Sequence, residues 1–201
     1  MRLGIFGGSF DPIHLGHLLL AEYCLELCHL DRIIFIPAES APHKLDSPPT
    51  PGKKRLEMLH LAVDDNQSFE VDPSELQREG PSYSVDTLAD FHERRPSDDL
   101  FFPMGADMFN YLPKWHQVER VCELTIPIVA CRPDTPKPDF DNLIGIVSPA
   151  RIETFKRYQI EIPQIGISST EIRRRIAADQ SIRYQTPQAV EEYIKDHKLY
   201  T

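Results

Sequence analysis

No apolar run in this 201-residue sequence approaches the length of about 18 residues that a membrane-spanning helix needs. Met1 and Arg2 lead directly into an apolar segment, so we also expect no secretory signal peptide. Basic residues are in the minority, with 22 Lys and Arg against 31 Asp and Glu, and the net charge is -9. Proteins that bind nucleic acid polymers usually carry a basic face, so this balance argues against that class. We expect a cytoplasmic protein that binds neither a membrane nor a nucleic acid polymer.

Cysteine is scarce, and its spacing does not predict a metal site. The cysteines are Cys24, Cys28, Cys122 and Cys131. Cys24 and Cys28 lie four residues apart on a predicted helix, but the sequence has no C-x-x-C pair and no second pair at suitable spacing. We therefore predict buried free thiols, in keeping with a reducing compartment, and no metal ion held by protein side chains.

The most informative segment that is present is LGIFGGSFDPIHLGH, at residues 3–17. Its apolar start at 3–6 predicts a short buried strand, which we expect Gly7 and Gly8 to end. An apolar pattern with helical spacing then covers residues 14–27. The segment therefore predicts a strand, a glycine turn and a helix.

Two histidines, His14 and His17, fall in the first turn of this predicted helix. A cationic side chain is unfavourable there, because the N-terminus of a helix carries a partial positive charge. The position suits histidines that hold an anion, since backbone N–H groups already point at it. Residues three apart lie on one helix face, so we predict that both histidines bind one anionic ligand.

Apolar segments continue to alternate with helical patterns along the chain. We predict further strands at 32–37, 69–72, 100–105, 125–131, 144–148 and 160–163, and helices at 53–63, 84–95, 106–112, 115–123, 167–179 and 187–197. This alternation predicts an α/β fold, a doubly wound parallel sheet with helices on both faces. We expect a single domain over 1–201, with a small C-terminal helical part at about 167–201.

Several glycine and basic residues follow predicted strands. Gly7, Gly105 and Arg132 each come directly after a strand. In a parallel sheet the carboxyl ends of the strands meet at one edge, where ligands bind. We therefore expect these residues to share the ligand edge of the sheet.

A second anion motif is ISSTEIRRRI, at residues 167–176. Ser168, Ser169 and Thr170 are N-cap residue types that precede an apolar-periodic helix. Their hydroxyls and the free backbone N–H groups can cradle an anion, and Arg173 lies one turn further on, where a guanidinium can bind a phosphate. The alternative is a capped helix with a solvated arginine face.

Together, GGSFDPIHLGH and ISSTEIR resemble the H-x-G-H nucleotidylyltransferase superfamily. Further segments resemble the bacterial nicotinate-nucleotide adenylyltransferase family in order and spacing: APHK at 41–44, the helix with Arg55, PSYS at 81–84 with Thr87, MGADMFNYLPKWH at 104–116 and ACR at 130–132. The resemblance covers nearly the whole chain. It departs mildly at Ser9, where threonine is frequent, and at His116, where tyrosine is common.

The resemblance implies a Rossmann-like nucleotidylyltransferase fold and transfer of the adenylyl group of ATP to nicotinate mononucleotide. The products are deamido-NAD and pyrophosphate, in NAD biosynthesis. The acceptor phosphate is already anionic, so in-line attack needs neither a general base nor a covalent intermediate. Mg²⁺ is implied as a cofactor bound through the ATP phosphates. The resemblance leaves open whether the protein forms a homo-oligomer.

The resemblance also implies roles for individual residues. Catalytic roles fall to His14, His17, Lys44 and Arg173. ATP binding is implied for Gly7, Gly8, Ser9, Phe10, His14, His17, Gly105, Asp107, Ile167, Ser168, Ser169, Thr170 and Arg173. Acceptor binding is implied for Lys44, Tyr83, Ser84, Thr87, Trp115, His116 and Arg132. Two alternatives stay open, namely Trp115 as a core anchor and Asp107 as a helix cap.

Other activities fit parts of the same pattern. A sibling adenylyltransferase could act on nicotinamide mononucleotide or phosphopantetheine, although the second kind of enzyme lacks the GAD…PKWH block. The HLGH segment also resembles the HIGH signature of class I aminoacyl-tRNA synthetases, but the sequence has no KMSKS motif. A non-catalytic nucleotide-binding sensor is the alternative from a different class.

Overall fold

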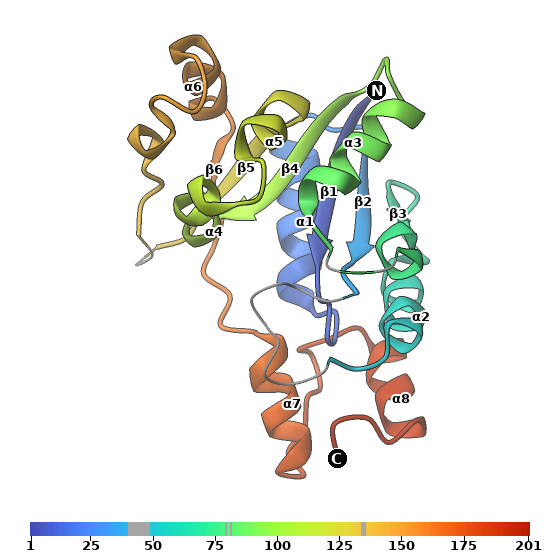
Figure 1. Cartoon of the computed structure of the whole chain (residues 1–201). Coiled ribbons are helices and arrows are strands. Elements are labelled where there is room, and N and C mark those ends of the chain that lie inside the picture. Colours follow the sequence, from blue (N-terminus) through green and yellow to red (C-terminus); the bar gives the residue numbers. More distant parts are fainter. Residues whose placement is uncertain (40–48, 79, 81, 134–135) are drawn as a thin grey trace. The chain divides into compact units, whose positions relative to one another are not determined.

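The computed structural model describes residues 1–39, 49–78, 80, 82–133 and 136–201 (Figure 1). Within this described part, a six-stranded sheet has the order β3-β2-β1-β4-β5-β6. The strands are β1 (Arg2–Gly8), β2 (Arg32–Pro37), β3 (Phe69–Val71), β4 (Asp99–Gly105), β5 (Ile126–Cys131) and β6 (Gln159–Glu161). The pairs β1–β4, β4–β5 and β5–β6 are parallel. The predicted α/β fold with a parallel sheet is confirmed.

Helices follow most of the strands along the chain. They are α1 (Leu15–Leu27), α2 (Gly52–Val63), α3 (Ser84–Arg94), α4 (Ala106–Tyr111), α5 (Val118–Leu124), α6 (Pro149–Lys156), α7 (Ser169–Ala177) and α8 (Gln188–Asp196). Short 3-10 helices are η1 (Ser74–Gln77), η2 (Leu112–Lys114) and η3 (Phe140–Leu143). In the described ranges, no helix combines the length and apolar character needed to cross a membrane.

Two local expectations differ from the structure. β1 continues through the glycine pair instead of ending there, because the Gly8 carbonyl accepts a hydrogen bond from the Ala38 amide at 2.9 Å. The strand predicted at 144–148 is wrong. Ile144 forms only an isolated bridge to Val147, and its side chain is 69% exposed, so no neighbouring surface buries this apolar stretch as a strand.

The described chain divides into two compact units. The first unit comprises Met1–Phe6, Leu20–Ile34 and Tyr83–Gln164, and the second comprises Gly7–Leu19, Phe35–Ser82 and Ile165–Thr201. β1, β2 and α1 each contribute residues to both units. The expectation of one domain over 1–201 with a C-terminal helical part stays a prediction.

Apolar strands form the core of the first unit. Helices α4, α5 and α6 pack on β5, and α3 packs on α5. Side chains of β4 and β5 are almost completely buried, including Leu100, Phe101, Ile128, Val129 and Ala130. Strands buried on both faces have continuous apolar sequences, and this explains the unbroken apolar runs of β4 and β5.

Helix α2 is central to the second unit, where it packs on β3 and α8. Aromatic rings from separate segments also meet in this unit. Phe35 contacts Phe10 edge-on, with ring centroids 5.7 Å apart, and Phe69 in the same manner at 5.2 Å. These contacts fix the segment after β1 against β2 and β3 in this unit.

Arg151 of α6 closes the C-terminal end of α5 in the first unit. Its Nε donates to the carbonyl of Cys122 at 3.0 Å. Its Nη2 donates to the carbonyls of Glu123 at 3.3 Å and Thr125 at 2.9 Å. The last carbonyls of a helix have no partner inside it, so one guanidinium supplies the missing donors.

Replacing this guanidinium should destabilise the protein. We expect Arg151→Met to lower the free energy of unfolding by about 1 to 3 kcal/mol, because carbonyls at the end of α5 lose their donor. Urea denaturation measures the loss. Arg120→Met is the matched control, since Arg120 pairs with Glu123 at the surface at 3.0 Å and should contribute less than about 1 kcal/mol. Equal losses in the two variants would contradict this assignment.

Candidate phosphate-binding site

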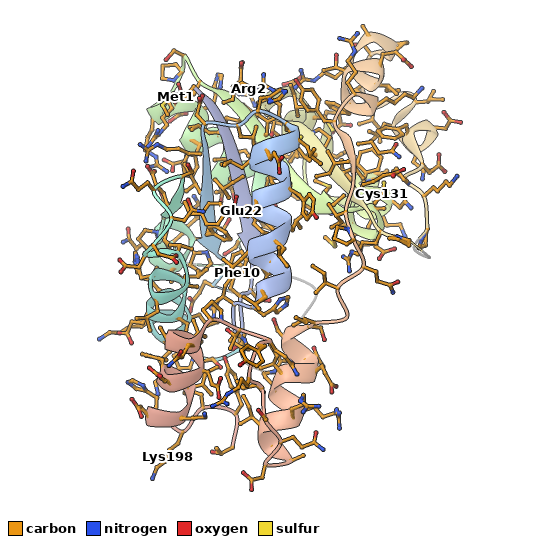
Figure 2. All side chains as sticks on the ribbon, turned by 180° about the vertical axis from the view of Figure 1, so that it is seen from behind. Met1, Arg2, Phe10, Glu22, Cys131 and Lys198 are labelled. Carbon is orange, nitrogen blue, oxygen red and sulfur yellow. The ribbon has the colours of Figure 1, made fainter. Side chains whose placement is uncertain are left out.

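The chain turns sharply after β1, in the second unit. Phe10 has a φ of +44°, in the left-handed region that few non-glycine residues adopt. A Cβ on Gly8 would lie 2.9 Å from the Phe10 ring, so glycine lets the chain fold back over this ring. Phe10 is 1% exposed and lies beside the first turn of α1 (Figure 2). Its ring supports the turn from within, and this leaves only its backbone to face a ligand.

The two histidines of the first motif lie against each other. The rings of His14 and His17 are stacked, with centroids 3.6 Å apart and planes 21° apart. The edge of the Phe10 ring contacts His17 at a centroid distance of 5.1 Å. His14 is 6% exposed, and burial lowers its pKa to about 4. Burial disfavours the charged form of the His14 ring, and a nearby anion would favour it.

The space around Gly16 explains why a glycine lies between the two histidines. A Cβ at this position would lie 3.0 Å from His14 Nδ1 and 3.7 Å from the carbonyl oxygen of Ile167. His14 Nδ1 is itself buried and has no hydrogen-bond partner in the described part of the chain. The glycine therefore leaves room for the His14 ring, and it brings the first motif up to Ile167, where the second motif begins.

The second motif is joined directly to the turn after β1. Ser169 Oγ donates to the carbonyl of Pro12 at 2.9 Å, and Arg173 Nη1 donates to the carbonyl of Asp11 at 2.6 Å. Both contacts lie within the second unit. The two predicted anion motifs, more than 150 positions apart in sequence, therefore meet in one place.

The start of α7 has the predicted N-cap. Ser168 is the N-cap residue, and its Oγ accepts a hydrogen bond from the Glu171 amide at 3.2 Å. Thr170 Oγ1 accepts a long hydrogen bond of 3.5 Å from Arg173 Nη2. Ser168 and Thr170 are exposed, whereas the Ser169 hydroxyl binds the turn after β1. An anion at this helix start would face Ser168, Thr170, Arg173 and backbone N–H groups.

Arg55 and Asp11 also support the site, although the sequence motifs do not predict them as site residues. Arg55 of α2 is fully buried and donates to the carbonyls of Ser9 at 2.7 Å and Thr50 at 2.8 Å. Asp11 is 7% exposed and accepts from the Tyr200 hydroxyl at 2.6 Å. Burial lowers the pKa of Arg55, and the nearby Asp11 charge opposes that shift.

A sequence signal for Arg55 exists. Arg55 lies on the apolar stripe of α2, three, four and seven positions before Met58, Leu59 and Ala62, which are all buried. An arginine at such a position is buried and must find acceptors. Tyr200 has no comparable signal, since it follows α8 outside any periodic pattern.

Most residues predicted to bind the acceptor lie in the first unit. The rings of Tyr83 and His116 are 4.6 Å apart between centroids, and Trp115 meets Phe102 edge-on at 5.8 Å. Trp115 is half-buried and His116 is exposed, whereas Thr87 is 2% exposed. Trp115 is therefore both anchored on the core and accessible at part of its surface.

The remaining predicted residues lie at the strand ends of the first unit, at the start of α3 or outside the described ranges. A Cβ on Gly105 would lie 3.4 Å from Arg132 Nη2, so the last residue of β4 and the residue after β5 adjoin as expected. Asp107 is exposed, and Gly105 is the N-cap of α4 without any side-chain cap, so the capping alternative for Asp107 is wrong. Ser84 is the first residue of α3. Lys44 lies outside the described residues, and its role stays a prediction.

Burial of His14 should make the stability of the protein depend on pH. The ordinary histidine pKa of 6.5 falls to about 4 in the folded state. The unfolded chain binds more protons between these values, so the free energy of unfolding decreases as pH falls from 6.5 to 4, by up to about 3 kcal/mol. His14→Gln should remove this part of the decrease in urea denaturation at several pH values. An NMR titration of the His14 ring with a midpoint near 6.5 would contradict it.

Comparison with known proteins covers the whole chain. Residues 5–175 match the cytidylyltransferase-like family. A probable nicotinate-nucleotide adenylyltransferase of Thermus thermophilus is 44% identical over 200 residues, which cover 100% of both chains. The nicotinate-nucleotide adenylyltransferase of Bacillus subtilis is 38% identical over 201 residues, which cover 99% of this chain and 98% of that one.

A solved structure has the same fold. The nicotinic acid mononucleotide adenylyltransferase of Plasmodium falciparum, complexed with NaAD, matches with a TM-score of 0.76. It is 20% identical in sequence, and the match covers 99% of this chain and 97% of that one. Identity this low supports the fold alone. The relatives matched over their full length show that this chain belongs to the nicotinate-nucleotide adenylyltransferases, nucleotidyltransferases of NAD biosynthesis with a cytidylyltransferase-like fold.

Proposed function

We propose that the second unit holds the triphosphate of ATP between the two histidines and the start of α7, and that the protein transfers the adenylyl group to nicotinate mononucleotide. The observation that carries this proposal is the contact between the two motifs, made by Ser169 on Pro12 and by Arg173 on Asp11. It brings an imidazole pair, a helix N-terminus and a guanidinium into one small region. Those are groups that bind phosphates.

The chemistry then needs positioning and charge neutralisation. A phosphate oxygen of the acceptor attacks the α-phosphorus of ATP, the bond from that phosphorus to the bridging oxygen breaks, and pyrophosphate leaves. We assign His14 and His17 to the α-phosphate, where negative charge grows during the attack. Thr170, Ser168 and Arg173 receive the leaving pyrophosphate. Arg173 donates one N–H to the Asp11 carbonyl and one to the Thr170 hydroxyl, and its other N–H groups can donate to phosphate oxygens.

Phosphate binding gives the stacked histidines a reason for their arrangement. Without an anion, burial keeps His14 neutral. A nearby phosphate raises the pKa of an imidazole, because the negative charge stabilises the protonated ring. His14 can therefore gain positive charge when ATP is bound, and that charge stabilises the transition state.

Mg²⁺ would reach the site with the nucleotide. The side chains at the joined motifs are imidazoles, hydroxyls and guanidinium groups, and the one buried carboxylate among them, Asp11, is bonded to Thr50 and Tyr200. These residues suit phosphates better than a hard cation, so we place the ion on the phosphates of ATP with water as its other ligands. When bound, it neutralises phosphate charge.

The acceptor would be recognised by residues of the first unit and by Lys44. A pyridine ring can stack on the accessible surface of Trp115, and Tyr83 and His116 offer polar groups beside a second aromatic surface. Arg132 is suited to the acceptor phosphate. We place this reaction in the cytoplasm, in keeping with the free cysteines of the chain.

The function is tested by pyrophosphate release. Purified protein with ATP and Mg²⁺ should release pyrophosphate with nicotinate mononucleotide, and more slowly or not at all with nicotinamide mononucleotide or phosphopantetheine. Chelation of Mg²⁺ by EDTA should abolish release. ATP binding without release for any acceptor would favour a nucleotide sensor, and faster release with another acceptor would assign the protein to that sibling activity.

The glycine between the histidines offers a sharper test of the site. The Cβ added in Gly16→Ala would lie 3.0 Å from His14 Nδ1 and would displace the His14 ring. A displacement of this kind at a phosphate contact should reduce kcat/KM for ATP by about 10-fold or more. Gly166→Ala is the matched control, because a Cβ there meets nothing within 4 Å. A Gly16→Ala variant with unchanged turnover would exclude the proposed role of His14.

A further inference from the structure

Tyr200 reaches the phosphate turn from a distant part of the chain. Its hydroxyl donates to Asp11 Oδ1 at 2.6 Å, across 189 positions of sequence. Lys198 and Tyr200 both have left-handed backbone angles, with φ of +49° and +65°. Such angles are uncommon for these residue types, and surrounding contacts must hold them. The chain after α8 is therefore bent so that the phenol ring reaches the turn.

Asp11 is the residue at which several contacts meet. Its Oδ2 accepts from the Thr50 amide at 3.2 Å, while its main-chain carbonyl accepts from Arg173 Nη1 at 2.6 Å. Tyr200 thus holds one oxygen of the same residue whose carbonyl holds the guanidinium of α7. Burial and the adjacent carboxylate raise the pKa of Tyr200, so the phenol remains a proton donor at neutral pH.

We propose that Tyr200 is a positioning residue for adenylyl transfer, which fixes Asp11 and through it the guanidinium of Arg173 at the phosphate site. This inference rests on the proposed function, and it adds a residue that lies outside both sequence motifs. Tyr200 touches no reacting atom in this account. Its effect passes through the Asp11 carbonyl, which sets where the remaining donors of Arg173 point.

The strength of the contact makes the effect measurable. A short hydrogen bond to an ionised carboxylate is about twice as strong as one between neutral groups. When the phenol is removed, Asp11 Oδ1 loses this donor and the turn at 9–12 can shift. Displacement of a phosphate ligand by about 1 Å can reduce a rate by about 100-fold, so even a partial shift affects turnover.

The chain offers a matched control for a general loss of stability. Tyr193 of α8 also donates its hydroxyl to a carboxylate in the second unit, that of Glu57 on α2. This contact joins α2 to α8 and involves none of the phosphate-site residues. Tyr193→Phe therefore removes the same kind of bond from the same unit, and it keeps the aromatic ring, as Tyr200→Phe does.

The kinetic test compares Tyr200→Phe with Tyr193→Phe at a temperature well below the midpoints of thermal unfolding of both variants. We expect Tyr200→Phe to reduce kcat and the single-turnover rate about 10-fold, while KM for nicotinate mononucleotide changes less than about twofold. Tyr193→Phe should keep kcat within about twofold of the unaltered protein. Unchanged kcat in Tyr200→Phe, or an equal loss in both variants, would overturn the proposal.

A second measurement does not depend on activity. Hydrogen exchange at the Thr50 amide, which donates to Asp11, should be at least about fivefold faster in Tyr200→Phe and unchanged in Tyr193→Phe. The Thr50 side chain also bonds to the Tyr200 hydroxyl, so this exchange reports on the joint contact of Tyr200, Asp11 and Thr50. Equal exchange in the two variants would show that Tyr200 does not fix Asp11. If the unaltered protein releases no pyrophosphate with any acceptor, the proposed function fails, and faster exchange would still support the contact as a restraint on the turn.

Discussion

The phosphate turn depends on finding hydrogen-bond donors for its carbonyl groups. Irregular backbone cannot satisfy its own carbonyls, and a buried carbonyl without a donor is costly. Here the donors are side chains from distant segments. Arg55 donates to the carbonyl of Ser9, and Arg173 donates to that of Asp11. Ser169 donates to the carbonyl of Pro12, and Thr186 donates to that of Ile13 at 2.8 Å. The shape of residues 9–13 is therefore set by contacts with α2, α7 and the segment before α8.

This arrangement links stability to the readiness of the site. Arg55 and Ser169 donate to backbone carbonyls of the turn, and Arg55 also lies 3.9 Å from the Glu39 carboxylate, whereas Arg173 uses part of its guanidinium on Asp11 and has donors left over. His14 is held the other way, packed over Gly16 and uncharged until an anion arrives. In the proposed mechanism, Arg173 supplies a permanent positive charge, and His14 gains one when a phosphate binds.

Sequence reasoning found the elements that carry repeating or motif-like signals. The strand, turn and helix at 3–27, the N-cap at Ser168 and the parallel sheet all follow from local patterns, and the structure has them. It did not find Tyr200, because a donor to one carboxylate leaves no periodic trace. It placed the end of β1 too early, since backbone pairing of Gly8 overrides the usual preference of glycine for turns. It left the capping role of Asp107 open, and the structure excludes this role because Gly105 is the N-cap of α4.

The two compact units carry different parts of the expected chemistry. The residues proposed for the phosphates of ATP lie in the second unit, and most of those proposed for the acceptor lie in the first. Ser169 and Arg173 are bound to the turn after β1 by side-chain to backbone hydrogen bonds, and His14 and His17 are stacked on each other, so a change at one disturbs its neighbours. The acceptor residues are held by ring contacts at a partly exposed surface, as His116 is against Tyr83. The departure from the family pattern at His116 falls among these loosely constrained positions, where a substitution can alter acceptor recognition without disturbing the phosphate turn.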